Sequence, residues 1–226
     1  MSGRAPRAAE CEILTHRKRQ ACPGALFASE RSENLNPEPI SIGVLIGSLR
    51  RHSINRRLFE ELRRLAPETI DLREIAIGKL PHYNEDLEQN PPPVVVEFRD
   101  AIDASDGILF LTPEFNHSIP GVLKNAIDWA SRPAPRPSLY GKPGAILGGS
   151  SGRSGTMRAQ LALRQILPVA NVLLMNKPDV YVTFAEEKFD SDGHLTDAQT
   201  IDQLRDHIAG FVQWIALIEQ GSAVFA

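Results

Sequence analysis

Residues 40–65 read ISIGVLIGSLRRHSINRRLFEELRRL, and the fold can be argued outward from this pattern. The first seven residues, 40–46, form a continuous apolar run, which is typical of a parallel strand buried on both faces. A polar loop follows at 47–53. The next segment, 54–65, carries apolar residues at helical spacing and charges on its other face. A buried strand, a loop and an amphipathic helix form the first unit of a parallel α/β sheet.

The same alternation of strand and helix continues to the end of the chain. Further strands are expected at 69–75, 107–111 and 143–147, and further helices at 93–104, 121–131 and 156–167. Segments 171–175 and 179–184 together predict a fifth strand with a bulge near Pro178, and Thr196 is the predicted N-cap of a last helix. These units predict a doubly wound, three-layer α/β/α fold with five parallel strands. Such sheets bind ligands beyond the carboxyl ends of their strands, which selects the loops after strands one, three and four.

Composition narrows the chemistry that these loops can carry. The chain has 226 residues, a formal net charge of −3 and 42% hydrophobic residues, which suffices for a core and gives no basic surplus for nucleic acid. No apolar run is long enough to span a bilayer. Both cysteines, Cys11 and Cys22, precede Pro39. A disulfide scaffold, a cysteine zinc site, an iron–sulfur cluster and a cysteine nucleophile are therefore excluded from the rest of the chain.

The first 38 residues differ from the rest, because no apolar period persists in them. A basic cluster at 16–19 precedes a short apolar stretch at 21–28, but a Pro-Gly pair breaks that stretch and acidic residues surround it. This is unlike a targeting signal. We expect residues 1–38 to be a flexible, disordered extension, residues 39–220 to form the folded domain, and the protein to be cytoplasmic.

The loop at 47–53 and the start of the next helix combine two hydroxyls, an arginine and an asparagine with free helix N-terminal amides. Such N–H groups and the helix dipole attract a phosphate, and hydroxyl and guanidinium groups complete its shell. The pattern is neither G-x-G-x-x-G nor G-x-x-x-x-G-K-[ST], so a Rossmann fingerprint and a Walker loop both fail. The alternative is a helix capped by Ser53 beside a solvated Arg50. In a five-stranded sheet, the phosphate loop favours a mononucleotide.

The loop at 112–121 reads TPEFNHSIPG. Two prolines stiffen a segment that presents an aromatic ring, backbone amides and polar side chains. A flat heteroaromatic ligand needs such a wall, with donors and acceptors for its edge and apolar surface for its face. The alternative is a Pro-rich turn before a helix, with Phe115 in the core and His117 on the surface.

The loop at 148–156 reads GGSSGRSGT. Its glycines let the backbone approach a ligand closely, and Arg153 could meet a phosphate. The segment also fits G-x-S-x-G, the nucleophile elbow of hydrolases, with Ser150 as nucleophile and with Asp179 and His194 in the required order. This hydrolase is the weaker alternative, because no His-Gly-Gly-type oxyanion segment is present and the other two loops would have no role.

Three segments together resemble the NADPH-dependent FMN reductase family, especially its chromate- and quinone-reducing members. They are 47–50 with Ser53 and Asn55, then 112–129, and then 152–156 with 158–160 and 163–165. The middle segment is the most specific, and the similarity spans about residues 40–218. The resemblance implies a flavodoxin-like fold that binds one FMN per subunit non-covalently. The family usually has Tyr where this chain has Phe115, so a hydroxyl contact is lost although ring packing can persist.

The resemblance also implies which residues bind the cofactor. The FMN phosphate site would comprise Ser48, Arg50, Ser53, Ile54 and Asn55. The isoalloxazine ring would be lined by Pro113, Glu114, Phe115 and Asn116, with Gly149, Ser150, Ser151, Gly152 and Arg153 near its other edge. Arg153 could also favour the 2′-phosphate of NADPH, with a solvent-facing arginine as the alternative. No catalytic residue and no metal site are predicted, because the cofactor carries the chemistry.

The implied reaction passes hydride from NADPH to FMN and then electrons to a small-molecule acceptor, such as a quinone, an azo compound, chromate or free flavin. Neither nucleic acid nor membrane is an expected partner. The resemblance implies a homodimer or homotetramer, in which the loop 83–86 could contribute across the subunit boundary. A non-enzymatic FMN electron carrier and a serine hydrolase using Ser150 stay open as alternatives.

Overall fold

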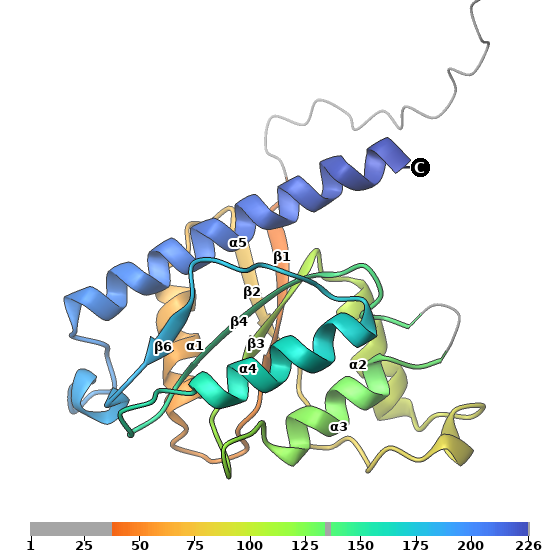
Figure 1. Cartoon of the computed structure of the whole chain (residues 1–226), viewed down its shortest axis with the longest axis horizontal. Coiled ribbons are helices and arrows are strands. Elements are labelled where there is room, and N and C mark those ends of the chain that lie inside the picture. The colour runs from red at the N-terminus through yellow and green to blue at the C-terminus, as the bar shows by residue number, and fades with distance from the viewer. Residues whose placement is uncertain (1–37, 134–136, 226) are drawn as a thin grey trace, which may run out of the picture. The chain divides into compact units, whose positions relative to one another are not determined.

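The computed structural model describes residues 38–133 and 137–225, where a parallel sheet carries helices on both faces (Figure 1). The predicted disordered extension, residues 1–38, lies outside these residues except for Glu38. The strands are β1 (Ile40–Ile46), β2 (Ile70–Glu74), β3 (Gly107–Leu111), β4 (Pro143–Gly149), β5 (Leu173–Leu174) and β6 (Val180–Val182). The helices are α1 (Ile54–Leu65), α2 (Pro93–Asp103), α3 (Gly121–Ala130), α4 (Met157–Ile166) and α5 (Ala198–Phe225), with 3₁₀ turns η1 (Glu85–Leu87), η2 (Leu167–Ala170) and η3 (Ala185–Lys188).

The strand order is β2-β1-β3-β4-β5, and every pairing is parallel. This is the flavodoxin-like doubly wound order, so the predicted α/β fold class is confirmed. The chain leaves β1 toward β2 and returns to β3 on the other side of β1. The strand order therefore reverses between β1 and β3, which is where such folds bind ligands.

The predicted fifth strand is divided into two short strands on the same neighbour. Leu173 of β5 pairs with Pro143 at the start of β4, whereas Val180 of β6 pairs with Leu147 near its end. Pro178 lies between them and has no N–H to give to a ladder. The prediction of one bulged strand is corrected to two strands separated by this proline segment.

The apolar runs of the strands are buried on both faces, as their sequences indicate. Val44 and Leu45 of β1 are both fully buried although they point to opposite faces. One face packs against α1 and α5, and the other packs against α2, α3 and α4. Helices therefore cover both faces, and only the strand ends and connecting loops can form a ligand site.

The start of α5 differs from the prediction, which placed the N-cap at Thr196. The carboxylate of Asp197 accepts the N–H of Thr200 at 3.0 Å, while the Thr196 hydroxyl donates to the carbonyl oxygen of Lys188 at 3.2 Å. Asp197 is favoured because it also pairs with the Lys188 ammonium at 2.6 Å. Hydrogen bonds from Lys188 and Thr200 lower the pKa of Asp197 to about 2.

None of the helices within 38–133 and 137–225 is both long and apolar enough to cross a membrane.

Candidate functional site

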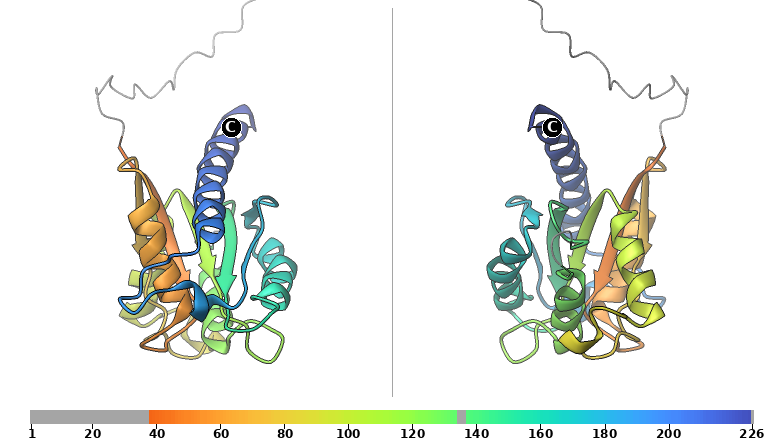
Figure 2. Two further views of the ribbon diagram at one scale, coloured as in Figure 1. Left: turned by 90° about the vertical axis from the view of Figure 1, so that its left-hand side faces the viewer. Right: turned by 90° about the vertical axis from the view of Figure 1, so that its right-hand side faces the viewer.

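Three loops leave the sheet at one edge, where the carboxyl ends of β1, β3 and β4 lie side by side. Ile46 of β1 pairs with Leu111 of β3, which pairs with Leu147 of β4, so the segments that follow start almost level. They are named loop 1 (47–53), loop 2 (112–120) and loop 3 (150–156). Figure 2 shows the first two at the lower end of the sheet, on either side of the strand-order reversal.

Loop 1 presents a row of backbone N–H donors. Within the described residues, the N–H groups from Ser48 to Ser53 have no acceptor, whereas the N–H of Gly47 bonds to the Leu111 carbonyl at 2.7 Å. The Ser53 side chain caps α1 by accepting the N–H of Arg56 at 3.4 Å. Ser48 and Ser53 are buried, and Arg50 is exposed. Free N–H groups beside a helix N-terminus, two hydroxyls and a guanidinium form a suitable donor set for a phosphate.

Asn55, which the sequence assigned to the phosphate site, bonds to the backbone of Gly149 in the structure. Its amide is 1% exposed, donates to the Gly149 carbonyl at 3.1 Å and accepts the Gly149 N–H at 3.0 Å. Both ends of the amide are therefore used within the protein, and they join the start of α1 to the end of β4. Ile54 is close to the same glycine, because a Cβ on Gly149 would lie 3.1 Å from its Cγ2. Asn55 thus fixes loop 1 relative to loop 3.

Glycines allow the strands to approach one another at this edge. The structure places Gly148 and Gly149 inside β4 and buried, so the predicted glycine loop begins only at Ser150. A Cβ on Gly148 would collide with the carbonyl oxygen of Thr112 and the hydroxyl of Thr156. A Cβ on Gly152 would have only the Ser150 hydroxyl nearby, at 3.8 Å. Gly148 therefore serves packing, whereas the backbone at Gly152 is open to a ligand.

The tip of loop 2 is a two-residue hairpin. Phe115 and Ser118 exchange backbone hydrogen bonds of 3.0 and 2.9 Å, and Asn116 and His117 both have positive φ, 50° and 63°. Two consecutive left-handed residues are typical of a type I′ turn, and asparagine and histidine are both enriched at positive φ. The hairpin holds Phe115 with 54% of its surface exposed, while Pro113 is buried beside Gly47. Phe115 thus lies at the surface and outside the core.

The Glu114 side chain contacts the start of α4. Its carboxylate accepts a hydrogen bond of 2.6 Å from Nε of Arg158. It also accepts the backbone N–H groups of Arg158 and Ala159 at 3.0 and 3.4 Å. Burial raises the pKa of Glu114, but the hydrogen bonds from Arg158 and Ala159 outweigh that effect and leave the pKa below its usual value. The charge also suits the N-terminus of α4. Glu114 therefore anchors loop 2 to the helix that follows loop 3.

Two residues of the segment 112–129, Asn125 and Trp129, contact the segment 81–83. The Asn125 amide donates to the Pro81 carbonyl at 2.9 Å and accepts the N–H of Tyr83 at 2.7 Å. The indole N–H of Trp129 bonds to the same carbonyl at 2.8 Å. Both side chains therefore hold the 81–83 segment against α3.

Loop 3 is held by contacts that the sequence did not indicate. The Ser150 hydroxyl donates to the Gly155 carbonyl, and the Ser150 and Gly152 carbonyls accept the N–H groups of Ala185 and Phe184 at 3.0 and 3.2 Å. Phe184 has φ of 46° and is 47% exposed. A bulky residue in this region of φ is strained, and such strain clusters at functional sites. No local periodicity points to it.

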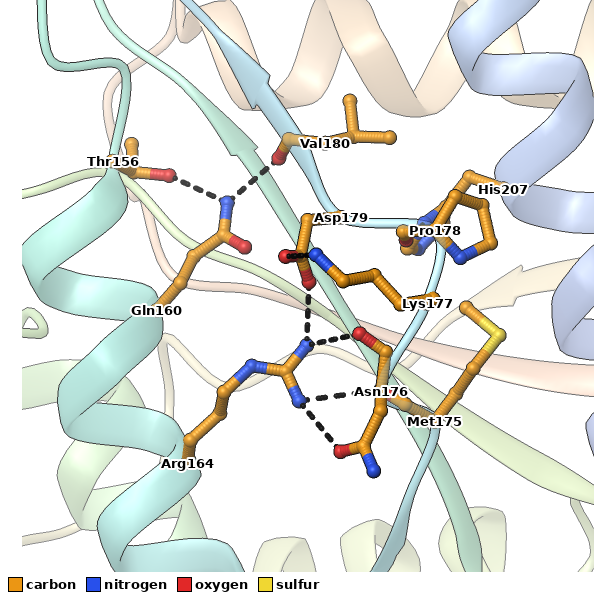
Figure 3. A network of polar contacts seen from close by, with 10 residues as sticks. All are labelled: Thr156, Gln160, Arg164, Met175, Asn176, Lys177, Pro178, Asp179, Val180 and His207. Carbon is orange, nitrogen blue, oxygen red and sulfur yellow. Dashed lines mark hydrogen bonds and ion pairs between the residues drawn. The ribbon is translucent and has the colours of Figure 1, made fainter.

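The hydrolase alternative fails on geometry. Asp179 pairs with Arg164 at 3.0 Å and Lys177 at 2.6 Å (Figure 3). His194 lies 3.5 Å from a carboxylate oxygen of Glu61, beside α1. Since the Ser150 hydroxyl is directed at a backbone carbonyl, no contact joins the three residues of the predicted triad within the part of the chain that the structure describes.

The remaining predicted residues, Ser151 and Arg153, are exposed on loop 3. No cluster of three metal-ligating side chains occurs within residues 38–133 and 137–225. The site thus offers a phosphate donor set at loop 1 and an exposed ring, Phe115, at loop 2. It also offers open backbone at Gly152. Phosphate, ribityl chain and flat ring are the parts of FMN, so the residues fit that group. A flavodoxin-like sheet with such a site defines a class of protein, the FMN-binding α/β flavoproteins.

Comparison with known proteins gives the family within that class. Residues 40–187 match the model of the family described as NADPH-dependent FMN reductase. A 2-hydroxy-1,4-benzoquinone reductase from a Burkholderia species is 40% identical over 176 residues, covering 78% of this chain and 96% of its own. An NAD(P)H-dependent FMN reductase from Pseudomonas aeruginosa is 42% identical over 179 residues, covering 79% and 96%. The chain belongs to the NADPH-dependent FMN reductase family and is an NAD(P)H-dependent oxidoreductase, as predicted.

Solved structures agree with this assignment. The FerB flavoenzyme NAD(P)H:(acceptor) oxidoreductase from Paracoccus denitrificans superposes with a TM-score of 0.74 at 40% identity, over 78% of this chain and 97% of that one. A flavodoxin, WrbA-like protein from Agrobacterium tumefaciens shares the fold alone, with a TM-score of 0.52 at 18% identity over 81% and 99% of the two chains. The flavodoxin-like fold predicted from the sequence is therefore confirmed.

Proposed function

We propose that the protein is an NAD(P)H:quinone oxidoreductase that holds one FMN non-covalently in loops 1, 2 and 3. The observation that carries this proposal is the row of unpartnered N–H groups in loop 1, which faces the same sheet edge as the exposed Phe115 and the open backbone at Gly152. The relatives named as quinone reductases support the choice of acceptor.

Loop 1 holds the phosphate in this proposal. Its N–H groups and the hydroxyls of Ser48 and Ser53 bond the phosphate oxygens, and Arg50 supplies the compensating charge. Asn55 and Ile54 support loop 1 from within the protein, since the Asn55 amide is already bonded to Gly149.

The ring lies between loops 2 and 3. Pro113, Phe115 and Asn116 border it on one side, and the backbone from Gly149 to Arg153 borders it on the other, with Ser150 and Ser151 between. Glu114 keeps loop 2 in place through Arg158. FMN supplies the hydride-transfer chemistry when bound, so the chain needs no acid–base pair. The residues of the chain bind two flat molecules and orient them toward each other. This positioning is how the chain raises the rate of hydride transfer.

A quinone suits this site because it is flat and small enough to take the place that the nicotinamide leaves. Phe115, which lacks the hydroxyl of tyrosine, offers only apolar surface to such a ligand. Azo compounds, chromate and free flavin would reach the same open face of the flavin, and we propose them as the other electron acceptors. A cytoplasmic homodimer or homotetramer stays a prediction, and size-exclusion chromatography with light scattering tests its oligomeric part.

Absorption and turnover of the purified protein test the function. We expect bound flavin with about one FMN per chain, and oxidation of NADPH or NADH when a benzoquinone is supplied. A protein that neither contains nor binds FMN would contradict the proposal. A flavoprotein that neither nicotinamide can reduce would be an electron carrier.

Replacement of Arg50 tests the phosphate site. Arg50→Ala should weaken FMN binding about tenfold, because a charge-assisted hydrogen bond to phosphate is lost. Arg63→Ala is the matched control, since Arg63 is an exposed arginine near the other end of α1 that pairs with Glu60 at 3.5 Å and lies over the Phe59 ring, away from loop 1. Equal FMN affinity of the two variants, measured by flavin fluorescence, would refute the role of Arg50.

A further inference from the structure

A cleft lies beside loop 1, along α1. It has a volume of about 570 Å³, and the turn at 190–194 forms its opposite wall. Arg50 and Ser53 line the cleft and also belong to loop 1. The cleft is therefore continuous with the proposed phosphate site and extends from it, away from loop 2.

Arginine dominates the lining of this cleft, although the whole chain has a net charge of −3. The arginines are Arg50, Arg51, Arg56, Arg57 and Arg64. Two of them are neutralised: Arg56 forms two bonds of 2.6 Å to Glu74, and Arg64 lies 2.5 Å from Glu61. Three guanidinium groups remain, on loop 1 and at the start of α1; Arg50 is assigned to the FMN phosphate, which leaves Arg51 and Arg57 for a second anion.

These three groups have no anionic partner among the described residues. Arg50 and Arg51 are exposed at the mouth of the cleft. The guanidinium of Arg57 lies over the ring of Phe189, 4.4 Å from its centre, and its Nε is buried without a hydrogen-bond partner. An aromatic ring, and not a carboxylate, thus fixes Arg57 in place, which leaves its charge available to an incoming anion.

The acidic residues of the cleft are largely occupied. Glu60 pairs with Arg63 at 3.5 Å. The Asp190 carboxylate accepts the N–H groups of Asp192 and His194 at 3.0 and 2.8 Å and so closes its own turn. Only Asp192 faces solvent without such a contact in the described structure. The balance of charge near loop 1 is positive, which concentrates anions there.

We propose that this cleft binds the 2′-phosphate of NADPH and makes the enzyme prefer NADPH to NADH. This rests on the proposed function, which places the nicotinamide over the ring between loops 2 and 3, and it adds that the adenosine end extends past loop 1 into the cleft. The two dinucleotides differ only by that phosphate, and arginine is the side chain that best matches a phosphate in geometry and charge. Arginines also receive the 2′-phosphate in other dinucleotide folds.

Arg51 is the residue that recognises this phosphate, because it is exposed, unpaired and outside the set of side chains assigned to FMN. Arg57 forms the floor of the same subsite. Arg153, which the sequence offered for this role, stands on loop 3 and does not line the cleft. Replacement of Arg153 therefore tests the alternative location of the 2′-phosphate site.

The test uses the FMN-loaded protein and two measurements. Arg51→Gln should lower the ratio of kcat/KM for NADPH to kcat/KM for NADH about tenfold, as expected for one lost charge-assisted contact. Calorimetry should show that adenosine 2′,5′-bisphosphate binds the wild-type protein more tightly than 5′-AMP, and that Arg51→Gln removes the difference. Arg57→Gln should act in the same direction. Arg63→Gln, a control on the same helix, should leave both measurements unchanged.

Three results would overturn the inference. One is equal use of NADPH and NADH together with equal binding of the bisphosphate and 5′-AMP. A second is a loss of NADPH preference in Arg153→Gln and not in Arg51→Gln. Both leave the proposed function standing, because the protein still oxidises a nicotinamide dinucleotide. The third is a protein that oxidises neither dinucleotide, which overturns the proposed function and this inference with it.

Discussion

Asn55→Ala should separate loop 1 from loop 3 and weaken both the fold and FMN binding. The side chain is 1% exposed and forms two hydrogen bonds, of 3.1 and 3.0 Å, with the backbone of Gly149. Alanine removes both bonds and leaves the N–H and the carbonyl of a buried glycine without partners. Leu58, Ile54 and Val182 crowd this glycine, so water cannot easily replace the amide.

The size of the effect follows from the two stranded groups. Each buried backbone group that loses its partner costs about 1–3 kcal/mol. Partial relaxation of loop 3 reduces the sum, and we expect a loss of about 3 kcal/mol in the free energy of unfolding. For a domain of this size that loss corresponds to a fall in Tm of about 6–12 °C.

Urea denaturation and thermal unfolding of the FMN-free protein measure the loss, and flavin fluorescence measures the affinity. The control is Gln203→Ala, which removes an exposed amide from α5 and should change stability by less than about 0.5 kcal/mol. Asn55→Asp adds a finer comparison, since aspartate can still accept the Gly149 N–H but cannot donate to its carbonyl. It should lie between alanine and the wild-type protein.

Two results would refute this reasoning. If Asn55→Ala were as stable as Gln203→Ala and lost only FMN affinity, the amide would be contacting the phosphate directly, as the sequence pattern first suggested. Unchanged stability and unchanged affinity would mean that the contact with Gly149 contributes neither to folding nor to the position of loop 1.

Four further substitutions test other parts of the structure. Burial holds the pKa of His207 at about 4 against a usual 6.5, so its folded form stays neutral while the unfolded chain takes up a proton, and wild-type stability should fall by about 3 kcal/mol between those pH values. Urea denaturation of His207→Leu at several pH values should show a shallower fall. Glu114→Gln removes the charge that faces Arg158 and should cost about 1 kcal/mol, with a several-fold loss of FMN affinity by fluorescence. Gly148→Ala should cost about 3 kcal/mol in thermal unfolding, because its Cβ has no room, whereas Gly152→Ala should cost less than about 0.5 kcal/mol.

The fold could be predicted because its strands are buried on both faces and therefore appear as unbroken apolar runs. The run at 40–46 is β1 to the residue, and 107–111 is β3. The fifth strand failed for the opposite reason, since β5 and β6 have only two and three residues and a proline stands between them. Such short pairings depend on β4, which the local sequence cannot reveal.

The loops of the site could also be predicted, because topology alone sends them to one edge. The individual roles within them could not. Asn55 and Glu114 carry polar groups that suit a ligand, yet their partners are Gly149, 94 residues away, and Arg158, 44 residues away. A sequence pattern shows which groups a loop offers, whereas long-range contacts decide which of those groups stay free.

Phe184 and the turn at 116–117 illustrate a different limit. Both have a left-handed backbone, which the Phe115–Ser118 bonds accompany at the turn and the bond to the Gly152 carbonyl accompanies at Phe184. The turn at 116–117 had a usable signal, an asparagine followed by a histidine, since both residue types tolerate positive φ, whereas a bulky residue such as phenylalanine does not favour it. Phe184 had none.

Reduction of the bound flavin under anaerobic conditions tests the central claim most directly. The purified protein should show the absorption bands of oxidised flavin, NADPH should bleach them, and a benzoquinone added afterwards should restore them with an equal amount of quinone reduced. A protein without flavin bands that also fails to take up FMN, or a flavin that neither NADPH nor NADH bleaches, would contradict the account.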